Sequence, residues 1–541
     1  MFRSIRIALA VNLLVCLAAA QSLHLSGENM RAHVKYLSSD ELEGRGVGSH
    51  GEKLATEYLA AQLALEGVKP GGENGTYFQT VPLVMAKTLP DATMVIEGKG
   101  KKIPLTFVKD VVGTSYSQMP ENDFNAEAVF VGHGISAPEF GWDDYKGVDL
   151  HGKVAVFFTN EPPSTDPKFF GGPALTYYGR WTYKYEEATR RGAVAALIIH
   201  TTPTAGYGWG VVSGSWSLEH PEMKLEPGQR GLKFEGWVTS EAGQELVAST
   251  GKTLDQLLAM ANQKSFHPIA LGVHIDAHVP VAFRQIESRN VIGRVEGEGQ
   301  NLKDQAVLFT AHWDHLGIGV PVNGDKIYNG AVDNATGCAM VLEIARVWAA
   351  LPSKPKRSAL FAFVTAEEAG LLGSEYYGRH PIVPAGSTAV DLNFDAFSPF
   401  GRTRDVSVTG AERTTLWPLV ERDADRLQLS ITPDPEPGQG DYYRSDHFSL
   451  ARVGIPSFSI SAGHRYVGKP DSYGDEVFEE YNSKHYHQPS DEYHDNWDFA
   501  GMIQMADFGL TLGLDIANTP RLPTWHAGDE FLAARQKSGV N

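Results

Sequence analysis

Three short apolar runs lie in the second half of the chain, each followed by polar residues. They are AVLFTA at 306–311, ALFAFVT at 359–365 and VDLNF at 390–394. The sequence GAVDNATG at 330–337 leads Asp333 into a helix-like segment that runs to about 351. Short buried strands that alternate with helical segments are typical of a parallel sheet with crossover helices. We therefore predict an α/β fold whose mixed, mostly parallel sheet is flanked by helices.

Helical patterns also occur in the first and last parts of the chain. Apolar residues recur at helical spacing over 54–65, and two further helices are expected at 414–427 and 502–516. The sequence GVGSHG at 46–51 has the spacing G-x-G-x-x-G of a dinucleotide site. No strand precedes it, so we interpret it as a turn that leads into the first helix.

The strand pattern changes between about 122 and 285. Short apolar strands are expected at 126–135, 153–158 and 193–200, with a helix at 183–192, and the outer pattern resumes at 288–297. We predict a domain at 122–285 inserted between two parts of one larger domain, 21–121 and 286–541. Within the insert, TAGYGWGVVSGSW at 204–216 is rich in Gly, which permits alternative backbone states, so we expect a mobile loop there.

The chain begins with a pattern typical of a secretory signal peptide. Arg3 and Arg6 precede an apolar stretch, and three alanines follow it. We expect residues 1–20 to be removed and the protein to be secreted or periplasmic. Lipid anchoring at Cys16 is less favoured, because Val15 is a poor residue before a lipidated cysteine. No later apolar run approaches the ~20 residues of a membrane span, so no integral membrane segment is expected after cleavage.

The overall charge and the cysteine content exclude some classes of function. The chain has 47 Lys plus Arg against 65 Asp plus Glu, a formal net charge of -18. This acidity argues against nucleic acid or an anionic membrane surface as a partner. Removal of the signal peptide leaves one cysteine, Cys338, which cannot form an internal disulfide and is expected to be a small buried residue.

Side chains able to bind a metal follow each of the three apolar runs. His312 and Asp314 follow the first, Asp333 precedes the helical segment, Glu367 and Glu368 follow the second, and Asp395 follows the third. Each alone has an ordinary structural explanation, such as a helix N-cap for Asp333 or the first turn of a helix for the two glutamates. Because the carboxyl ends of parallel strands meet at one edge of a sheet, these acids would repel one another unless a cation lay between them.

The motifs that contain these residues form a recognisable set. The sequences TAHWDHLG, AVDNATG, TAEEAGLLGS, NFDAF and HYHQPSDEY follow the pattern H-x-D, D-N-A-[ST]-G, E-E, Asp after a strand, and a late Tyr-His. The set resembles the catalytic core of the co-catalytic zinc aminopeptidases, metallopeptidase family 28, and implies the zinc exopeptidase fold. The last motif adds His487; His464, His485 and His494 do not fit Y-H-Q-P-x-D.

The resemblance implies a role for each of these side chains. Asp333 would bridge two Zn²⁺ ions, His312 and Asp395 would complete one site, and Glu368 and His487 would complete the other. Mn²⁺ or Co²⁺ are plausible substitutes, since the ligands are nitrogen and oxygen atoms without a thiolate.

The residues beside the ligands also receive roles from the resemblance. Glu367 would be the general base, and Asp314 would orient the imidazole of His312. A cis peptide bond is expected between Asp333 and Asn334.

A later segment, GDYYRSDHFS, also has a counterpart in the family near the rim of the active site. Ser445, Asp446 and His447 are adjacent in sequence, and adjacency does not give the relay geometry of a hydrolase triad. We expect Asp446 or His447 to contact the metal ligands without binding the metal. Tyr442 is a candidate donor to the developing oxyanion.

The function implied is that of a dinuclear zinc exopeptidase acting on peptides. Hydroxide held by the metals would attack the amino-terminal peptide bond, and Glu367 would shuttle the proton to the leaving amine. A carboxypeptidase or dipeptidase of the same clan is the alternative; a single-zinc glutaminyl cyclase and a non-catalytic receptor-like module are less favoured. The insert resembles a protease-associated domain and is either a lid, which we favour, or a spacer. The sequence leaves the oligomeric state open.

Overall fold

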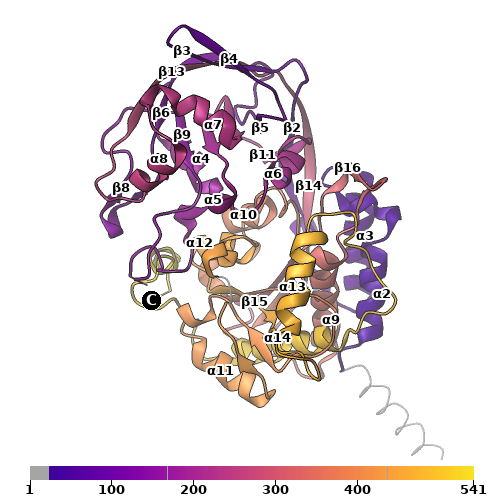
Figure 1. Ribbon diagram of the computed structural model, residues 1–541. Helices are drawn as coiled ribbons and strands as arrows, with labels where there is room; N and C mark the ends of the chain where they lie inside the picture. Colours follow the sequence, from indigo (N-terminus) through magenta and orange to yellow (C-terminus); the bar gives the residue numbers. More distant parts are fainter. Residues whose placement is uncertain (1–23, 167, 435–436, 541) are drawn as a thin grey trace, which may run out of the picture. The chain divides into compact units, whose positions relative to one another are not determined.

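The computed structural model describes residues 24–166, 168–434 and 437–540 (Figure 1). The chain folds as two compact units. Unit 1 comprises Met1–Val81, Glu287–Pro435 and Arg444–Asn541, and unit 2 comprises Pro82–Ile286 and Glu436–Tyr443. The expected signal peptide at 1–20, including Cys16, lies outside the described residues.

Unit 1 contains the sheet that the apolar runs predict. Its central strands are β14 (Val281–Val295), β18 (Ser358–Val364), β15 (Ala306–His312), β19 (Thr388–Asn393) and β22 (Ser457–Ser459), in that order. Strand β15 pairs in parallel with both β18 and β19, and β19 pairs in parallel with β22. Strand β14 is antiparallel to β18, as is β1 (Lys69–Pro70) to β14. The mixed, mostly parallel sheet of the predicted α/β fold is confirmed.

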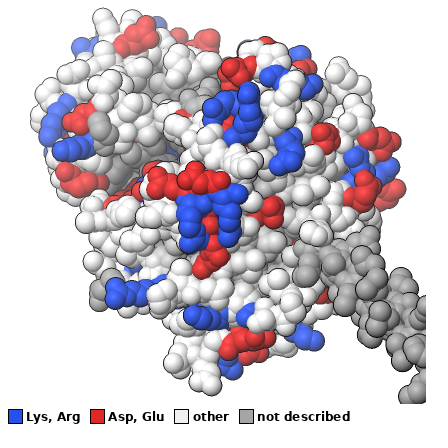
Figure 2. All heavy atoms as spheres, turned by 90° about the horizontal axis from the view of Figure 1, so that it is seen from below, with Lys and Arg blue, Asp and Glu red and all other residues white. Residues whose placement is uncertain are grey.

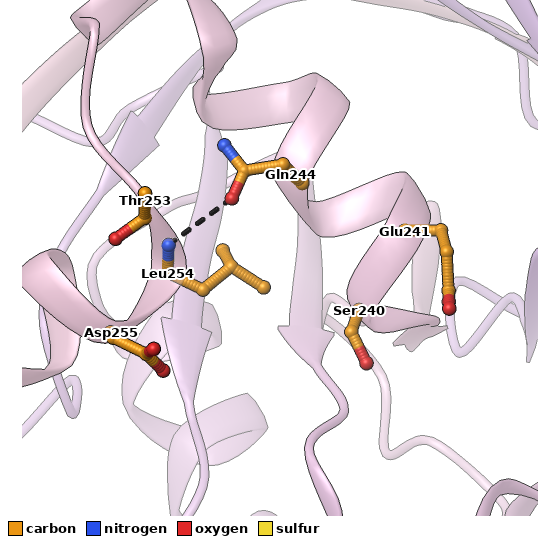
Figure 3. A pocket seen from close by; sticks show the side chains of 6 residues that line it. All are labelled: Ser240, Glu241, Gln244, Thr253, Leu254 and Asp255. Carbon is orange, nitrogen blue, oxygen red and sulfur yellow. Dashed lines mark hydrogen bonds between the residues drawn. The ribbon is translucent and has the colours of Figure 1, made fainter.

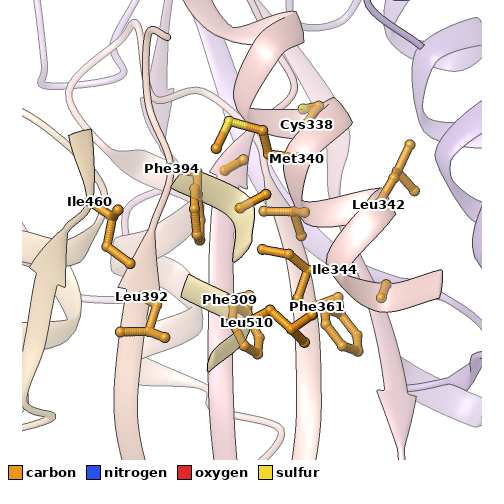
Figure 4. Packing of buried hydrophobic residues seen from close by; sticks show 14 of the residues in the cluster. Phe309, Cys338, Met340, Leu342, Ile344, Phe361, Leu392, Phe394, Ile460 and Leu510 are labelled. Atoms are coloured by element: carbon orange, nitrogen blue, oxygen red, sulfur yellow. The ribbon is translucent and has the colours of Figure 1, made fainter. Parts of the chain in front are cut away.

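Both faces of this sheet are buried, which explains why its strands are continuous apolar runs. In β15, Val307, Phe309 and Ala311 belong to one core, whereas Ala306 and Leu308 belong to a second core on the opposite face. The first core contains the aromatic pair Phe309–Phe361, whose rings stack 5.3 Å apart (Figure 4). A strand with only one buried face would alternate polar and apolar residues instead.

Helices cover the two faces of the sheet. The helices α9 (Thr336–Ala350) and α14 (Ala500–Asn518) contact the sheet on one face, and α2 (Gly27–Leu37) and α3 (His50–Leu65) pack against α9. The helix α12 (His447–Arg452) contacts β19 and β22. The helix predicted to run to about 351 and the helix predicted at 502–516 are confirmed. The helix predicted at 414–427 is shorter, α11 (Trp417–Arg426), which begins with Pro418 in its first turn because proline is tolerated there.

Unit 2 is built around a second mixed sheet. Its strand order is β4 (Lys101–Leu105), β3 (Thr93–Gly98), β13 (Ile269–His278), β6 (Phe124–Phe130), β9 (Val154–Phe158), β10 (Ala195–Ile199), β12 (Phe234–Val238) and β5 (Val111–Thr114). Strands β6, β9, β10 and β12 are parallel. The expected helix at 183–192 is present as α4 (Trp181–Arg190). Unit 2 begins at Pro82, earlier than the expected 122, and its assignment as a protease-associated domain stays a prediction.

The segment at 204–216 is not the loop that we expect from its glycines. It contains α6 (Trp209–Trp216), preceded by the short helix α5 (Thr202–Ala205). Val212 is buried in the core that contains Trp237, and Trp209 and Trp216 pack against the same core. Burial of these apolar side chains outweighs the cost of two helical glycines, about 1 kcal/mol each.

None of the helices in the described part of the chain has the length and the apolar character that a membrane span needs.

On the face of the molecule seen in Figure 2, basic side chains lie next to acidic ones. The acidic excess of the composition is therefore accompanied by local pairing, as in the ion pair between Arg404 and Asp471, whose atoms are 3.1 Å apart.

Candidate metal centre

The side chains expected to bind metal all leave the carboxyl ends of the unit 1 strands or the segments beside them. His312 is the last residue of β15, the two glutamates come three and four residues after β18, and Asp395 comes two residues after β19. Asp333 lies in the turn Ala331–Ala335 that leads into α9, and His487 lies in the segment after α13 (Tyr473–Lys484). Chain segments far apart in sequence thus meet at one edge of the sheet.

One group of donor atoms surrounds the imidazole of His312. Its Nε2 lies 3.2 Å from Oδ1 of Asp333 and 3.1 Å from Oδ1 of Asp395. The side chains of His312 and Asp333 are almost fully buried, with 1% and 6% of their surface exposed. Three donor atoms from three different strands or turns therefore face one another in a site shielded from solvent.

A second group of donor atoms surrounds the imidazole of His487. Its Nε2 lies 2.9 Å from Oε2 of Glu368 and 3.4 Å from Oδ2 of Asp333. The two oxygens of Asp333 therefore face two different histidines, which is the arrangement that a bridging carboxylate requires. The peptide bond between Asp333 and Asn334 is cis, so this expectation is confirmed.

The donor set fits zinc. It consists of imidazole nitrogens and carboxylate oxygens, and donor atoms of His312, Asp333 and Glu368 all lie within 4.8 Å of one another. Cys338 does not contribute: its thiol donates a hydrogen bond to the carbonyl of His312, and burial raises its pKa to about 12. It is buried, as its sequence context predicts.

The electrostatics of the site are dominated by burial and by the close carboxylates. Burial lowers the pKa of the His312 imidazole, but the carboxylates of Asp395 and Glu367 outweigh it and raise that pKa well above the usual value. Burial likewise acts to raise the pKa of Glu368, but the imidazoles of His487 and His315 bring it down to about 2. A cation bound here would take over the compensation of charge that the imidazoles supply, with release of their protons.

The main chain of the two adjacent glutamates is held by Asp314. Its carboxylate accepts the backbone N–H of Glu367 at 3.1 Å and that of Glu368 at 3.4 Å. Burial raises the pKa of Glu367 well above its usual value, and the negative charges of Asp395 and Glu368 add to this shift. A raised carboxyl pKa suits a group that must hold a proton near neutral pH.

Asp314 contacts His312 in a different way from the one expected. The Nδ1 atom of His312 lies 3.1 Å from the backbone carbonyl oxygen of Asp314 but 3.8 Å from its carboxylate. The carbonyl therefore orients the imidazole, because the carboxylate is occupied by the two backbone N–H groups. Burial raises the pKa of this carboxyl to about 8.

Sequence reasoning gave no role to three residues that contact this centre closely. Nδ1 of His315 lies 2.6 Å from Oε1 of Glu368, and Oγ of Ser445 donates to Asp395 at 2.6 Å. The carboxylate of Asp491 accepts the backbone N–H groups of Val332, at 2.9 Å, and Asp333, at 3.1 Å. All three lie inside quoted motifs, so their presence near the site, though not their partners, had a sequence signal.

The roles of the remaining candidate residues stay predictions. Asp446 is fully buried, and burial raises its pKa to about 7, with the His312 imidazole acting against the shift. His447 faces the side-chain amide of Asn393, its Nδ1 at 3.4 Å. Tyr442 belongs to the segment assigned to unit 2, and its role as an oxyanion donor stays a prediction.

Unit 2 has a surface pocket of its own between α7 (Ser240–Val247) and α8 (Leu254–Ala261). It is lined by Ser240, Glu241, Gln244, Thr253, Leu254 and Asp255 (Figure 3). The side-chain oxygen of Gln244 accepts the backbone N–H of Leu254 at 3.2 Å. None of the candidate catalytic or metal-binding residues lines this pocket.

Known proteins are similar to this chain in sequence or in fold. Carboxypeptidase Q of Bos taurus is 21% identical over 427 residues, which are 77% of this chain and 75% of that protein. Aminopeptidase YwaD of Bacillus subtilis is 39% identical over 100 residues, 18% of this chain and 19% of that protein. The solved structure of an aminopeptidase from Aneurinibacillus sp. strain AM-1, 20% identical, covers 94% of this chain and 98% of its own, with a TM-score of 0.54, and shows the same fold.

The family assignment rests on the region that carries the metal centre. Residues 290–511 match the family model described as "Peptidase family M28", and this range includes every candidate ligand from His312 to His487. The match, the shared fold and the converging donor atoms agree with one another. The chain therefore resembles peptidase family M28 over residues 290–511, and it shares its fold with a solved aminopeptidase.

Proposed function

We propose that this protein is a secreted dinuclear zinc exopeptidase that hydrolyses the amino-terminal peptide bond of peptides. The observation that carries the proposal is the position of Asp333, whose two carboxylate oxygens face separate histidine and carboxylate pairs. Secretion is supported by the sequence pattern of residues 1–20.

In this proposal five side chains hold two zinc ions. His312 and Asp395 would hold one ion, His487 and Glu368 would hold the other, and Asp333 would contribute to both; Mn²⁺ or Co²⁺ are plausible substitutes. When bound, such a pair polarises the scissile carbonyl and lowers the pKa of a water molecule. The buried walls of the site exclude bulk water and strengthen each electrostatic interaction.

Glu367 handles the proton. Its carboxylate accepts a proton from the attacking water and delivers it to the nitrogen of the leaving amine. The raised pKa of Glu367 and the hydrogen bond from its backbone N–H to Asp314 support this role. Its neighbour Glu368 is committed to His487, so the two adjacent glutamates have separate tasks.

The direction of cleavage has one serious alternative. The similarity to carboxypeptidase Q extends over 77% of the chain, whereas the similarity to aminopeptidase YwaD extends over 18%. A carboxypeptidase or a dipeptidase would use the same metals and the same Glu367. These enzymes differ in which terminus of the substrate they bind. The direction of cleavage must therefore be determined from the substrates that are hydrolysed.

The test is hydrolysis of a panel of aminoacyl anilides, amino-terminally blocked peptides and dipeptides, with and without chelator, by the wild type and Glu367→Ala. Chelator-sensitive release from free-amine anilides and longer peptides only, lost in the variant, would support the proposal. Cleavage confined to blocked peptides at their carboxyl end, or to dipeptides, would assign the alternative. Absence of turnover on every substrate despite about two bound metal ions would contradict the proposal that the protein is an exopeptidase.

A further inference from the structure

Behind Asp395, buried polar side chains form one continuous line of hydrogen bonds. Ser445 Oγ lies 2.6 Å from Asp395 Oδ2, and Asn393 Nδ2 lies 2.8 Å from Ser445 Oγ. Thr310 Oγ1 lies 2.8 Å from Asn393 Oδ1 and 2.8 Å from Asp391 Oδ1. Thr310, Asp391 and Asn393 are buried to 1% exposure or less.

The strand pairing creates this line. Thr310 of β15 is directly opposite Asn393 of β19, and Asp391 is two residues earlier on the same strand. Residues two apart on a strand point to the same face, so the hydroxyl of Thr310 reaches both side chains.

The direction of each hydrogen bond follows from a count of hydrogen atoms. As a metal ligand of the proposed function, Asp395 is ionised and carries no hydrogen. The only hydroxyl hydrogen of Ser445 therefore goes to Asp395, and Ser445 accepts from the amide nitrogen of Asn393. The amide oxygen of Asn393 then faces Thr310, whose only hydrogen must go to it.

The same count leaves one contact that needs another donor. Thr310 has used its hydrogen on Asn393, yet its oxygen lies 2.8 Å from Oδ1 of Asp391. With the amide of Asn393 reversed, the contact between its oxygen and Ser445 would lack a hydrogen instead, at 2.8 Å. A proton on Asp391 is the one assignment that supplies a hydrogen to every contact.

We propose that Asp391 is a neutral carboxylic acid and a positioning residue, whose proton sets the direction of the hydrogen bonds that hold Asp395. The inference rests on the proposed metal role of Asp395. The other oxygen of Asp391, Oδ2, is buried and has no hydrogen-bond partner among the residues that the structure describes, which a neutral acid tolerates better than a carboxylate does. Burial raises the pKa of Asp391 well above its usual value and outweighs the hydrogen bond with Thr310, which acts to lower it; the Asp446 carboxyl adds to the rise.

The first test measures the proton itself. Infrared difference spectra of the zinc-loaded wild type minus Asp391→Asn, at neutral pH, should contain the carbonyl stretch of a protonated carboxyl group. A pair of carboxylate bands in place of that stretch would overturn the proposal. The amide of the variant can donate to Thr310 in place of the acid, so its zinc affinity should stay within about threefold of the wild type, and a larger loss would also count against the proposal.

The second test breaks the line at Thr310, with zinc affinity measured by chelator competition. Thr310→Val removes the hydroxyl and should lower the affinity for one of the two zinc ions by about 10–100-fold. The control Thr310→Ser keeps the hydroxyl and should bind both ions with nearly the affinity of the wild type. Equal affinity in the valine and serine variants would overturn this inference alone. A wild type that binds fewer than two zinc ions would overturn the proposed function and the inference with it.

Discussion

The carboxylate of Asp314 accepts a hydrogen bond from the backbone N–H of Glu367, with 3.1 Å between the heavy atoms. A buried acid thus fixes the main chain at the point where two adjacent glutamates must point to different places. Glu368 turns to His487, and in the proposed function Glu367 acts on the substrate. This separation of tasks can be tested one side chain at a time.

Glu367→Gln is expected to reduce kcat by about 10²–10⁴-fold, because an amide cannot accept the proton of the attacking water. The metal content should stay at the wild-type value. Glu368→Gln is the matched comparison: it should lose metal, since it removes the charge that faces His487. Turnover together with metal content by plasma emission would show the difference, and equal metal loss in both variants would contradict the assignment.

His487→Ala should lower the bound metal from about two ions to about one, because it removes a ligand from only one of the two groups. His485→Ala is a close control, since the imidazole of His485 lies beside Ser490, 3.0 Å from its hydroxyl. The control should bind metal as the wild type does. Loss of metal in the His485 variant instead would mean that the wrong histidine of the motif has been chosen.

Asp491→Asn should weaken metal binding by about 10–100-fold through Asp333, because Asp491 holds the backbone N–H of that residue. The amide offers one acceptor fewer, so the free energy of unfolding should also fall by about 1–3 kcal/mol. Asp495→Asn, at a surface position, serves as control. Titration with zinc and thermal unfolding would measure both effects; an unchanged zinc affinity would show that Asp491 only stabilises the turn.

His220 of unit 2 should make stability sensitive to acid. Burial lowers the pKa of its imidazole to about 4, and its ring stacks on Trp216 at 5.6 Å. The imidazole of His220 takes up a proton near pH 6.5 in the unfolded chain but only near pH 4 in the folded state. The contribution of His220 is therefore complete above pH 6.5 and is lost as the pH falls to 4, by an amount on the order of 3 kcal/mol.

His220→Phe keeps an aromatic ring at this position and should flatten the fall of the unfolding temperature between pH 6.5 and pH 4. His267→Phe changes an exposed histidine of the same unit and should leave the slope as it is. Thermal unfolding across this pH range measures the effect. Identical slopes in the wild type and His220→Phe would rule out the buried imidazole as the cause.

Much of the fold of unit 1 could be predicted, because strands buried on both faces appear as unbroken apolar runs. The run at 306–311 became β15 and the run at 359–365 became β18, within one residue at each end. The segment at 204–216 could not be predicted in this way. Its glycines favour a loop, and only burial of Val212 in the core of unit 2 explains the helix α6.

The sequence by itself determined which residue types are available for the metal centre and placed them after apolar runs. It could also pair His312 with Asp395 as partners through family resemblance. Only the tertiary structure decided that the carbonyl of Asp314 orients His312, and that Asp391 stands at the end of the line behind Asp395. The physical reason is that these contacts depend on the register between β15 and β19 and on the direction of each donor, which local sequence does not encode.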